Sequence, residues 1–90
     1  MSTARTRFVL IFDGGSIGNP GAAYGSFRLQ RTGSPPLPVQ RLTFGRGTNN
    51  EAEYKALLGG LEVLERILSD EGLRSADVEI EVLGVSRMVL

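Results

Sequence analysis

Phe8-Val9-Leu10-Ile11-Phe12-Asp13-Gly14-Gly15 is the most informative stretch of this 90-residue chain. Its five apolar residues form an unbroken run, which is typical of a strand covered on both faces and therefore central in its sheet. The run ends at Asp13, and a dense set of turn residues follows up to Gly21. The sequence thus predicts a central strand whose end carries a carboxylate beside a glycine-rich loop.

Two further strands are predicted downstream of this loop. Ala22–Arg31 alternates apolar and polar residues, with Phe27 and Leu29 on the buried side. Residues 32–36 read as a hairpin connection, and a third strand is expected from Leu37 to Phe44. This segment contains Pro38, which cannot donate to a ladder, so we expect the third strand at the sheet edge. Three consecutive strands with short links predict an antiparallel meander.

The pattern then changes to that of a helix. Thr48-Asn49-Asn50-Glu51 has the form of a capping box, with Thr48 or Asn49 as the N-cap. Gly72 is the expected C-terminal stop. Gly59-Gly60 lies inside the helix and is tolerable if the helix sits close against the sheet. The apolar face is expected to consist of Tyr54, Leu57, Leu58, Leu61, Leu64 and Leu68.

A fourth strand is predicted from Val78 to Leu83, after which the residues from Val85 to Leu90 resemble the opening of a second helix. The right-handed crossover rule places the fourth strand parallel to the first and beside it. The predicted fold is therefore an α/β mixed sheet, β-β-β-α-β with strand order 3-2-1-4. We expect residues 1–90 to form one incomplete domain, truncated after the fourth strand.

Composition excludes several classes of function. The chain has no cysteine and no histidine, which removes disulfide scaffolds, zinc sites and histidine-based catalysis. The net charge is zero, which argues against a strongly basic DNA-binding protein. Lys55 is the single lysine among ten basic residues, and this preference for arginine is more simply a compositional bias than a phosphate site. No segment is long enough to be a signal peptide or to span a bilayer, so a cytoplasmic location is expected.

Two acidic residues have both a functional and a structural interpretation. Asp13, at the tip of a buried strand, is placed to hold a hard cation, or equally to cap the turn that follows. Glu53 lies in the first turn of the helix, where an acid interacts favourably with the helix dipole in any case. The loop from Asp13 to Gly21 lacks the lysine of a nucleotide-binding P-loop, and it leads into a strand, unlike a dinucleotide fingerprint.

Phe12-Asp13-Gly14-Gly15-Ser16 with Gly18-Asn19-Pro20-Gly21, followed by Thr48-Asn49-Asn50-Glu51-Ala52-Glu53, closely resembles type 1 ribonuclease H, specifically its N-terminal portion. The resemblance implies a ribonuclease H-like fold and hydrolysis of the RNA strand of RNA–DNA hybrids. It implies two-metal-ion catalysis with Mg²⁺, with Mn²⁺ as the alternative ion. The implied catalytic metal ligands are Asp13 and Glu53, and the implied contacts to the hybrid are Gly14, Gly15, Ser16, Asn19, Asn49 and Asn50.

The sequence departs from this family pattern in two ways. The family reads Gly-Asp-Ser after the fourth strand, where the aspartate is the third metal ligand, and this chain has Gly84-Val85-Ser86. The fourth acid of the family lies beyond the point where the chain ends. We therefore expect impaired hydrolysis. The alternatives are a non-catalytic module that binds nucleic acid, and a fragment that forms a homodimer through the exposed fourth-strand edge, the uncovered sheet face or the C-terminal tail.

Overall fold

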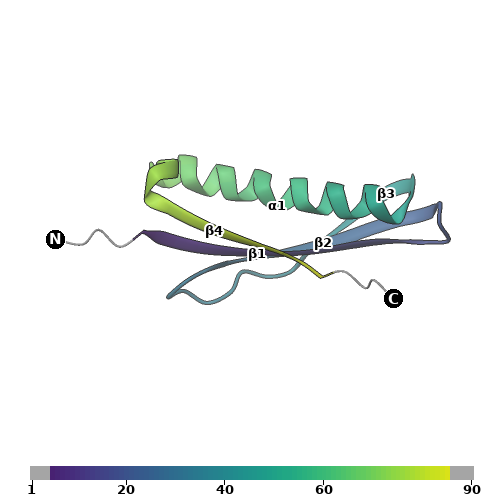
Figure 1. Ribbon diagram of the computed structural model, residues 1–90, viewed down its shortest axis with the longest axis horizontal. Coiled ribbons are helices and arrows are strands. Elements are labelled where there is room, and N and C mark those ends of the chain that lie inside the picture. The colour runs from purple at the N-terminus through teal and green to yellow at the C-terminus, as the bar shows by residue number, and fades with distance from the viewer. Residues whose placement is uncertain (1–4, 86–90) are drawn as a thin grey trace.

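A computed structural model describes residues 5–85 of the chain. One four-stranded sheet has the order β3-β2-β1-β4, and a single long helix lies along one of its faces (Figure 1). The elements are β1 (Thr6–Ile17), β2 (Gly21–Arg31), β3 (Gln40–Gly47), α1 (Asn49–Glu71), the short 3₁₀ helix η1 (Ser75–Asp77) and β4 (Val78–Gly84). The predicted β-β-β-α-β order and the 3-2-1-4 sheet are both confirmed.

β1 is the central strand, as the apolar run predicts. It pairs antiparallel with β2, where Phe12 lies opposite Phe27, and parallel with β4, where Phe12 lies opposite Gly84. The expectation that β1 is covered on both faces is wrong within residues 5–85, because α1 covers only one face. Phe8 and Leu10 are buried, whereas Val9 and Ile11 are only half-buried.

β3 lies at the sheet edge, but not because of Pro38. The strand begins at Gln40 rather than Leu37, so Pro38 belongs to the connection that precedes it. β3 pairs antiparallel with β2 and has a register shift between Ala23 and Tyr24. The meander is confirmed, and its third strand runs on to Gly47 because the residues after Phe44 continue the ladder.

α1 begins with the predicted capping box and ends at the predicted glycine. Thr48 is the N-cap: its hydroxyl accepts from the Glu51 N–H at 3.1 Å, and the Glu51 carboxylate accepts from the Thr48 N–H at 2.8 Å. Gly72 closes the helix in the left-handed conformation, with φ of 67°. This conformation suits a residue that lacks a Cβ.

The buried face of α1 differs from the one that leucine spacing predicts. Tyr54 and Leu58 are exposed, at 63% and 40%, so their inclusion in the apolar face is wrong. Small residues recurring every fourth position face the sheet instead, and the buried set is Ala52, Ala56, Gly60 and Leu64. The remaining predicted leucines pack at the margins of the core.

The close approach of helix and sheet explains the small residues. A Cβ added to Gly60 would lie 2.5 Å from Leu10 Cδ1, and one added to Gly59 would lie 3.2 Å from Leu42 Cδ1. The prediction that this glycine pair allows close packing is confirmed. The core between α1 and the sheet consists of Phe8, Leu10, Phe27, Leu29 and Leu64.

β4 extends the sheet without adding a buried side chain. Val78 is half-buried and the rest of the strand is exposed, although it pairs with β1 over its whole length. The second helix is predicted from Val85 to Leu90, and all of it except Val85 lies outside the described residues. Among the described residues, no helix combines the length and the hydropathy needed to span a membrane.

Candidate nucleic-acid interface

The start of α1 lies directly against the end of β1. A Cβ added to Gly14 would lie 2.5 Å from both the carbonyl carbon of Ala52 and the backbone nitrogen of Glu53. Only a residue without a side chain allows this approach, because the obstructing atoms are helix backbone. Gly14 therefore brings together the backbone segments that carry Asp13 and Glu53.

The glycine-rich loop is tied to the helix start by side-chain hydrogen bonds. The Ser16 N–H donates to Asn49 Oδ1 at 2.8 Å, and the Ser16 hydroxyl lies 3.1 Å from the same oxygen and also meets the Gly18 carbonyl. The Asn49 N–H donates to Asn19 Oδ1 at 3.2 Å. Three residues that are predicted to contact a hybrid thus form one network, although Asn49 lies 30 or more residues along the chain from the other two.

These bonds also orient the Asn49 amide. A backbone N–H can only donate, so the atom of Asn49 that faces Ser16 must be the amide oxygen. The amide nitrogen, with its two donors, then points away from Ser16. Asn50 follows on the first turn of α1 and is exposed. We call the surface formed by residues 14–16, Asn19, Asn49 and Asn50 the loop–helix surface.

The acids beside this surface do not complete a metal site. Asp13 and Glu53 are each half-buried. Val85 follows β4 directly, its N–H donates to the Phe12 carbonyl next to Asp13 in the chain, and its side chain offers no oxygen. No group of three Asp, Glu, His or Cys residues within residues 5–85 is arranged to hold a metal ion. The two Mg²⁺ ions implied by the resemblance therefore do not fit the donors that the described residues supply.

At the start of the helix, the capping box affects the ionisation of Glu51. Hydrogen bonds from the backbone and the hydroxyl of Thr48 lower the pKa of Glu51 below its usual range, with Lys55 adding a smaller effect in the same direction. The Glu51 carboxylate is thus held ionised by its role in the capping box. It serves the fold of the surface and not its chemistry.

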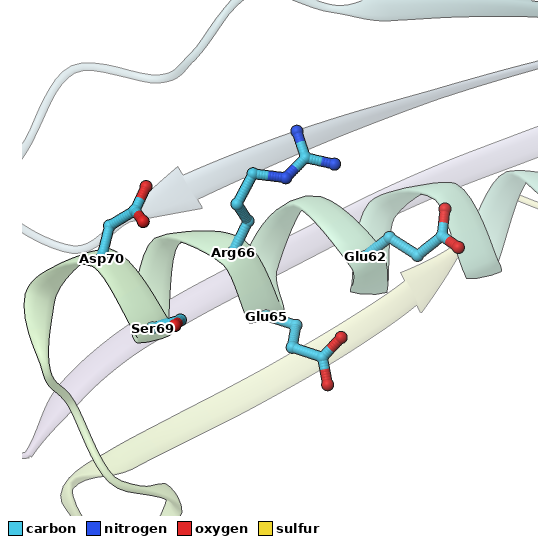
Figure 2. A pocket seen from close by; sticks show the side chains of 5 residues that line it. All are labelled: Glu62, Glu65, Arg66, Ser69 and Asp70. Atoms are coloured by element: carbon cyan, nitrogen blue, oxygen red, sulfur yellow. The ribbon is translucent and has the colours of Figure 1, made fainter.

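A polar groove of about 710 Å³ runs along the outer side of α1, in the second half of the helix (Figure 2). Its lining carries more carboxylates than guanidinium groups, so it does not suit a phosphate. It is also remote in sequence and along the helix from the loop–helix surface, which begins at Asn49. The lining residues are Glu62, Glu65, Arg66, Ser69 and Asp70.

Known proteins resemble the chain in both sequence and structure. The bifunctional protein Rv2228c of Mycobacterium tuberculosis is 36% identical over 85 residues, which are 93% of this chain and 21% of that protein. Ribonuclease HI of Halobacterium salinarum is 37% identical over 78 residues, which are 87% of this chain and 35% of that protein. No family model matches the chain.

Solved structures give the same result. LC11-RNase H1 in complex with an RNA/DNA hybrid superposes with a TM-score of 0.76 at 33% identity, covering 90% of this chain and 56% of that one. RNase H1 from Halobacterium salinarum gives a TM-score of 0.69 at 36% identity, with coverages of 91% and 56%. The N-terminal RNase H domain of Rv2228c gives a TM-score of 0.68 at 34% identity. The chain thus spans little more than half of these solved chains, and about a fifth to a third of the curated relatives.

The mixed sheet, its strand order and the crossover helix define the ribonuclease H-like class of folds. Within that class, both the similar sequence from Halobacterium salinarum and the similar solved structures are ribonucleases H of type 1. The chain corresponds to the N-terminal portion of type 1 ribonuclease H.

Proposed function

We propose that the chain binds the backbone of an RNA–DNA hybrid through the loop–helix surface, and that hydrolysis of the RNA strand is impaired in it. The hydrogen-bond network of Ser16, Asn19 and Asn49 carries the proposal. It holds the glycine-rich loop and the helix start in one fixed arrangement before any ligand arrives. Such preorganisation lowers the entropic cost of binding.

The chemistry of this surface suits a sugar–phosphate backbone. The Asn49 amide nitrogen points away from Ser16 and can donate to a 2′-hydroxyl or a phosphate oxygen, and the exposed Asn50 offers both a donor and an acceptor. Recognition of 2′-hydroxyls distinguishes RNA from DNA without reading base identity. Because the net charge is zero, we expect moderate affinity that depends on hydrogen bonds as well as on salt. The hybrid bound to LC11-RNase H1 supports this class of ligand.

The impairment follows from the donor atoms. Asp13 and Glu53 are the proposed catalytic carboxylates, and Val85 replaces the third ligand of the family pattern with an apolar side chain. Mg²⁺ retains several waters and needs octahedral oxygen donors, so two carboxylates provide an incomplete site for it. The family uses a pair of metal ions to activate water and to stabilise the leaving oxygen. Asp13 and Glu53, with Val85 at the third position, provide too few oxygen donors to hold such a pair.

Binding is tested by fluorescence anisotropy with a labelled hybrid and with a DNA duplex of the same sequence. The hybrid is expected to bind more tightly than the duplex. Asn50→Ala is the most informative variant. The side chain of Asn50 is exposed and takes part in none of the hydrogen bonds within residues 5–85, so its removal should leave the fold intact. We expect it to weaken hybrid binding by about 3- to 10-fold, the worth of one or two hydrogen bonds.

Ser69→Ala on the outer side of α1 is the matched control and is expected to bind like the parent chain. Equal affinity of the parent chain for hybrid and DNA duplex, or unchanged binding by Asn50→Ala, would contradict the proposal. The catalytic part is tested separately with a labelled hybrid in the presence of Mg²⁺ or Mn²⁺. Cleavage at a substantial rate that Asp13→Asn abolishes would show that hydrolysis is intact.

Self-association is a second candidate. The free edge of β4 exposes Ile80, Val82 and Leu83, each at 43–44%, which favours pairing with a second copy. Sedimentation at micromolar concentration tests the homodimer, and a stable monomer would exclude it. The cytoplasmic location and the extent of the domain stay predictions from the sequence.

A further inference from the structure

A second concave site lies on the opposite face of the sheet from α1. It has a volume of about 600 Å³ and is lined by the ends of β1, β2 and β3. Gly25 faces the helix, where an added Cβ would lie 3.0 Å from Ala56 Cβ. Tyr24 is the preceding residue, so its side chain leaves β2 on the other face. We call this the Tyr24 pocket.

The Tyr24 ring forms the floor of this site. Tyr24 lies opposite Gly15 in the β1–β2 ladder. A Cβ added to Gly15 would lie 2.8 Å from Tyr24 Oη and 3.1 Å from Cζ, so the ring rests on the bare backbone of β1. The residue is nevertheless 46% exposed. One side of the ring is therefore supported by the sheet and the other is open, which is the arrangement of a stacking platform.

The rest of the pocket is apolar apart from Thr43 and the single positive charge of Arg46. Arg46 lies opposite Ala22 and Thr43 opposite Tyr24, and both residues line the pocket together with the ring. Ile17, exposed at 76%, supplies an apolar wall at the end of β1. None of the described residues that line the pocket is acidic. The pocket thus combines a flat aromatic surface, an apolar wall and a single cation.

We propose that the Tyr24 pocket binds one unpaired nucleotide of a single-stranded nucleic acid, with its base against the Tyr24 ring and its phosphate on Arg46. A base in a duplex is already stacked on both sides and cannot lie on the ring, so the occupant is single-stranded. The positive charge and the absence of acids among the described lining residues favour an anionic backbone over a protein segment. The Tyr24 ring lies against Gly15 of the loop–helix surface, but the residues that line the pocket are different ones, and the site extends recognition to the single strand next to a hybrid.

The experiment compares a blunt RNA–DNA hybrid, the same hybrid with a short single-stranded extension at either end, and the single strand alone. Binding is followed by fluorescence anisotropy at several salt concentrations. Tyr24→Leu removes the ring but keeps an apolar side chain. It is expected to weaken binding of the single strand by about 5- to 150-fold, the range for loss of one base–aromatic stack. Arg46→Gln is expected to reduce the salt dependence by about one phosphate contact.

Tyr24→Phe keeps the ring and is the matched control, with unchanged binding expected. The blunt hybrid should bind both Tyr24 variants like the parent chain, whereas Asn50→Ala should weaken its binding, so this proposal and the proposed function can fail independently. Equal binding of the single strand by the parent chain and Tyr24→Leu would overturn the proposal. So would a Tyr24→Leu effect on sedimentation alone, since the occupant would then be a second copy. If Tyr24→Leu unfolds, Arg46→Gln decides the result through its salt dependence.

Discussion

The backbone N–H of Val85 donates a hydrogen bond of 2.8 Å to the carbonyl oxygen of Phe12. This bond belongs to the last pair of the parallel ladder, Phe12 opposite Gly84, so it ties down the backbone of Val85 one residue past the ladder, just as Asp13 follows Phe12 on β1. An apolar side chain therefore stands at the position that the resemblance predicts for a carboxylate. Its exposure of 47% shows that a polar side chain would also be accommodated there.

Val85→Asp is expected to raise hydrolysis of an RNA–DNA hybrid in the presence of Mg²⁺ or Mn²⁺. The substitution places a third carboxylate beside Asp13 without disturbing the backbone bond to Phe12. A gain of at least about tenfold, equivalent to about 1.4 kcal/mol of barrier, is expected in a single-turnover cleavage assay. Val85→Asn supplies a neutral oxygen and should give much less. No difference between these two variants would show that the charge at this position is not what limits the reaction.

Gly60→Ala is expected to destabilise the fold by about 1 kcal/mol, although alanine favours helices. The added Cβ would lie 2.5 Å from a methyl group of the fully buried Leu10, and such overpacking costs about 1–3 kcal/mol. The gain in helix propensity offsets about 1 kcal/mol of this. Urea unfolding measures the difference. Gly59→Ala has looser contacts, at 3.2 Å and beyond, and should cost less; a stabilised Gly60→Ala variant would contradict the proposed close packing.

The lowered pKa of Glu51 predicts that the fold loses stability in acid. Its pKa is lowered in the folded chain by the hydrogen bonds from Thr48, so its contribution to stability is present above the unfolded pKa. That contribution is lost as the pH falls through the range below the usual pKa of a glutamate, about 4.3. Glu51→Gln retains a capping side chain that does not titrate, and its urea midpoint should fall less steeply on acidification. Glu65→Gln makes the same change of charge away from the cap. Its urea midpoint should fall on acidification as steeply as that of the parent chain.

Arg31 and Glu71 join β2 to the end of α1. One guanidinium nitrogen of Arg31 lies 2.7 Å and 2.8 Å from the two carboxylate oxygens. The pair is partly exposed, so a double-mutant cycle with alanine should give a coupling of only about 0.5 kcal/mol, which decreases with added salt. The more exposed pair Arg74–Asp77, at 3.4 Å, should give a smaller value. A coupling well above this value would contradict the prediction. It would indicate that the contact of Arg31 with the Phe8 ring strengthens the ion pair with Glu71.

The topology of this chain was predictable because local signals and global rules agreed. The apolar run before Asp13 placed β1 at the centre, and the crossover rule placed β4 beside it. Thr48 and Gly72 marked the ends of α1 correctly, since caps depend on neighbouring residues only. The β3 boundary was wrong because Pro38 occupies a connection, and a proline does not reveal on which side of a strand boundary it lies.

The buried face of α1 was not predictable from leucine spacing. Large apolar residues mark a helix face when there is room for them, but at Gly60 the sheet is too close, and alanine and glycine occupy the contact. The bond between Ser16 and Asn49 was likewise missed, because it depends on how two segments meet in space. The Tyr24 pocket had one signal in the sequence: Tyr24 lies on the polar side of the β2 alternation, where an aromatic ring is unusual.

β4 is attached to the sheet by its main chain more than by its side chains. Beyond the half-buried Val78 the strand is exposed, so separating it from β1 breaks ladder hydrogen bonds but uncovers little additional apolar surface. Its opening free energy is therefore expected to be well below that of β1 and β2, and its amide hydrogens should exchange with solvent ahead of theirs. Val85, which follows β4, is thus attached to the part of the sheet that opens first. A ligand that binds both Val85 and Asp13 would hold β4 in place, and the amide hydrogens of β4 would then exchange more slowly.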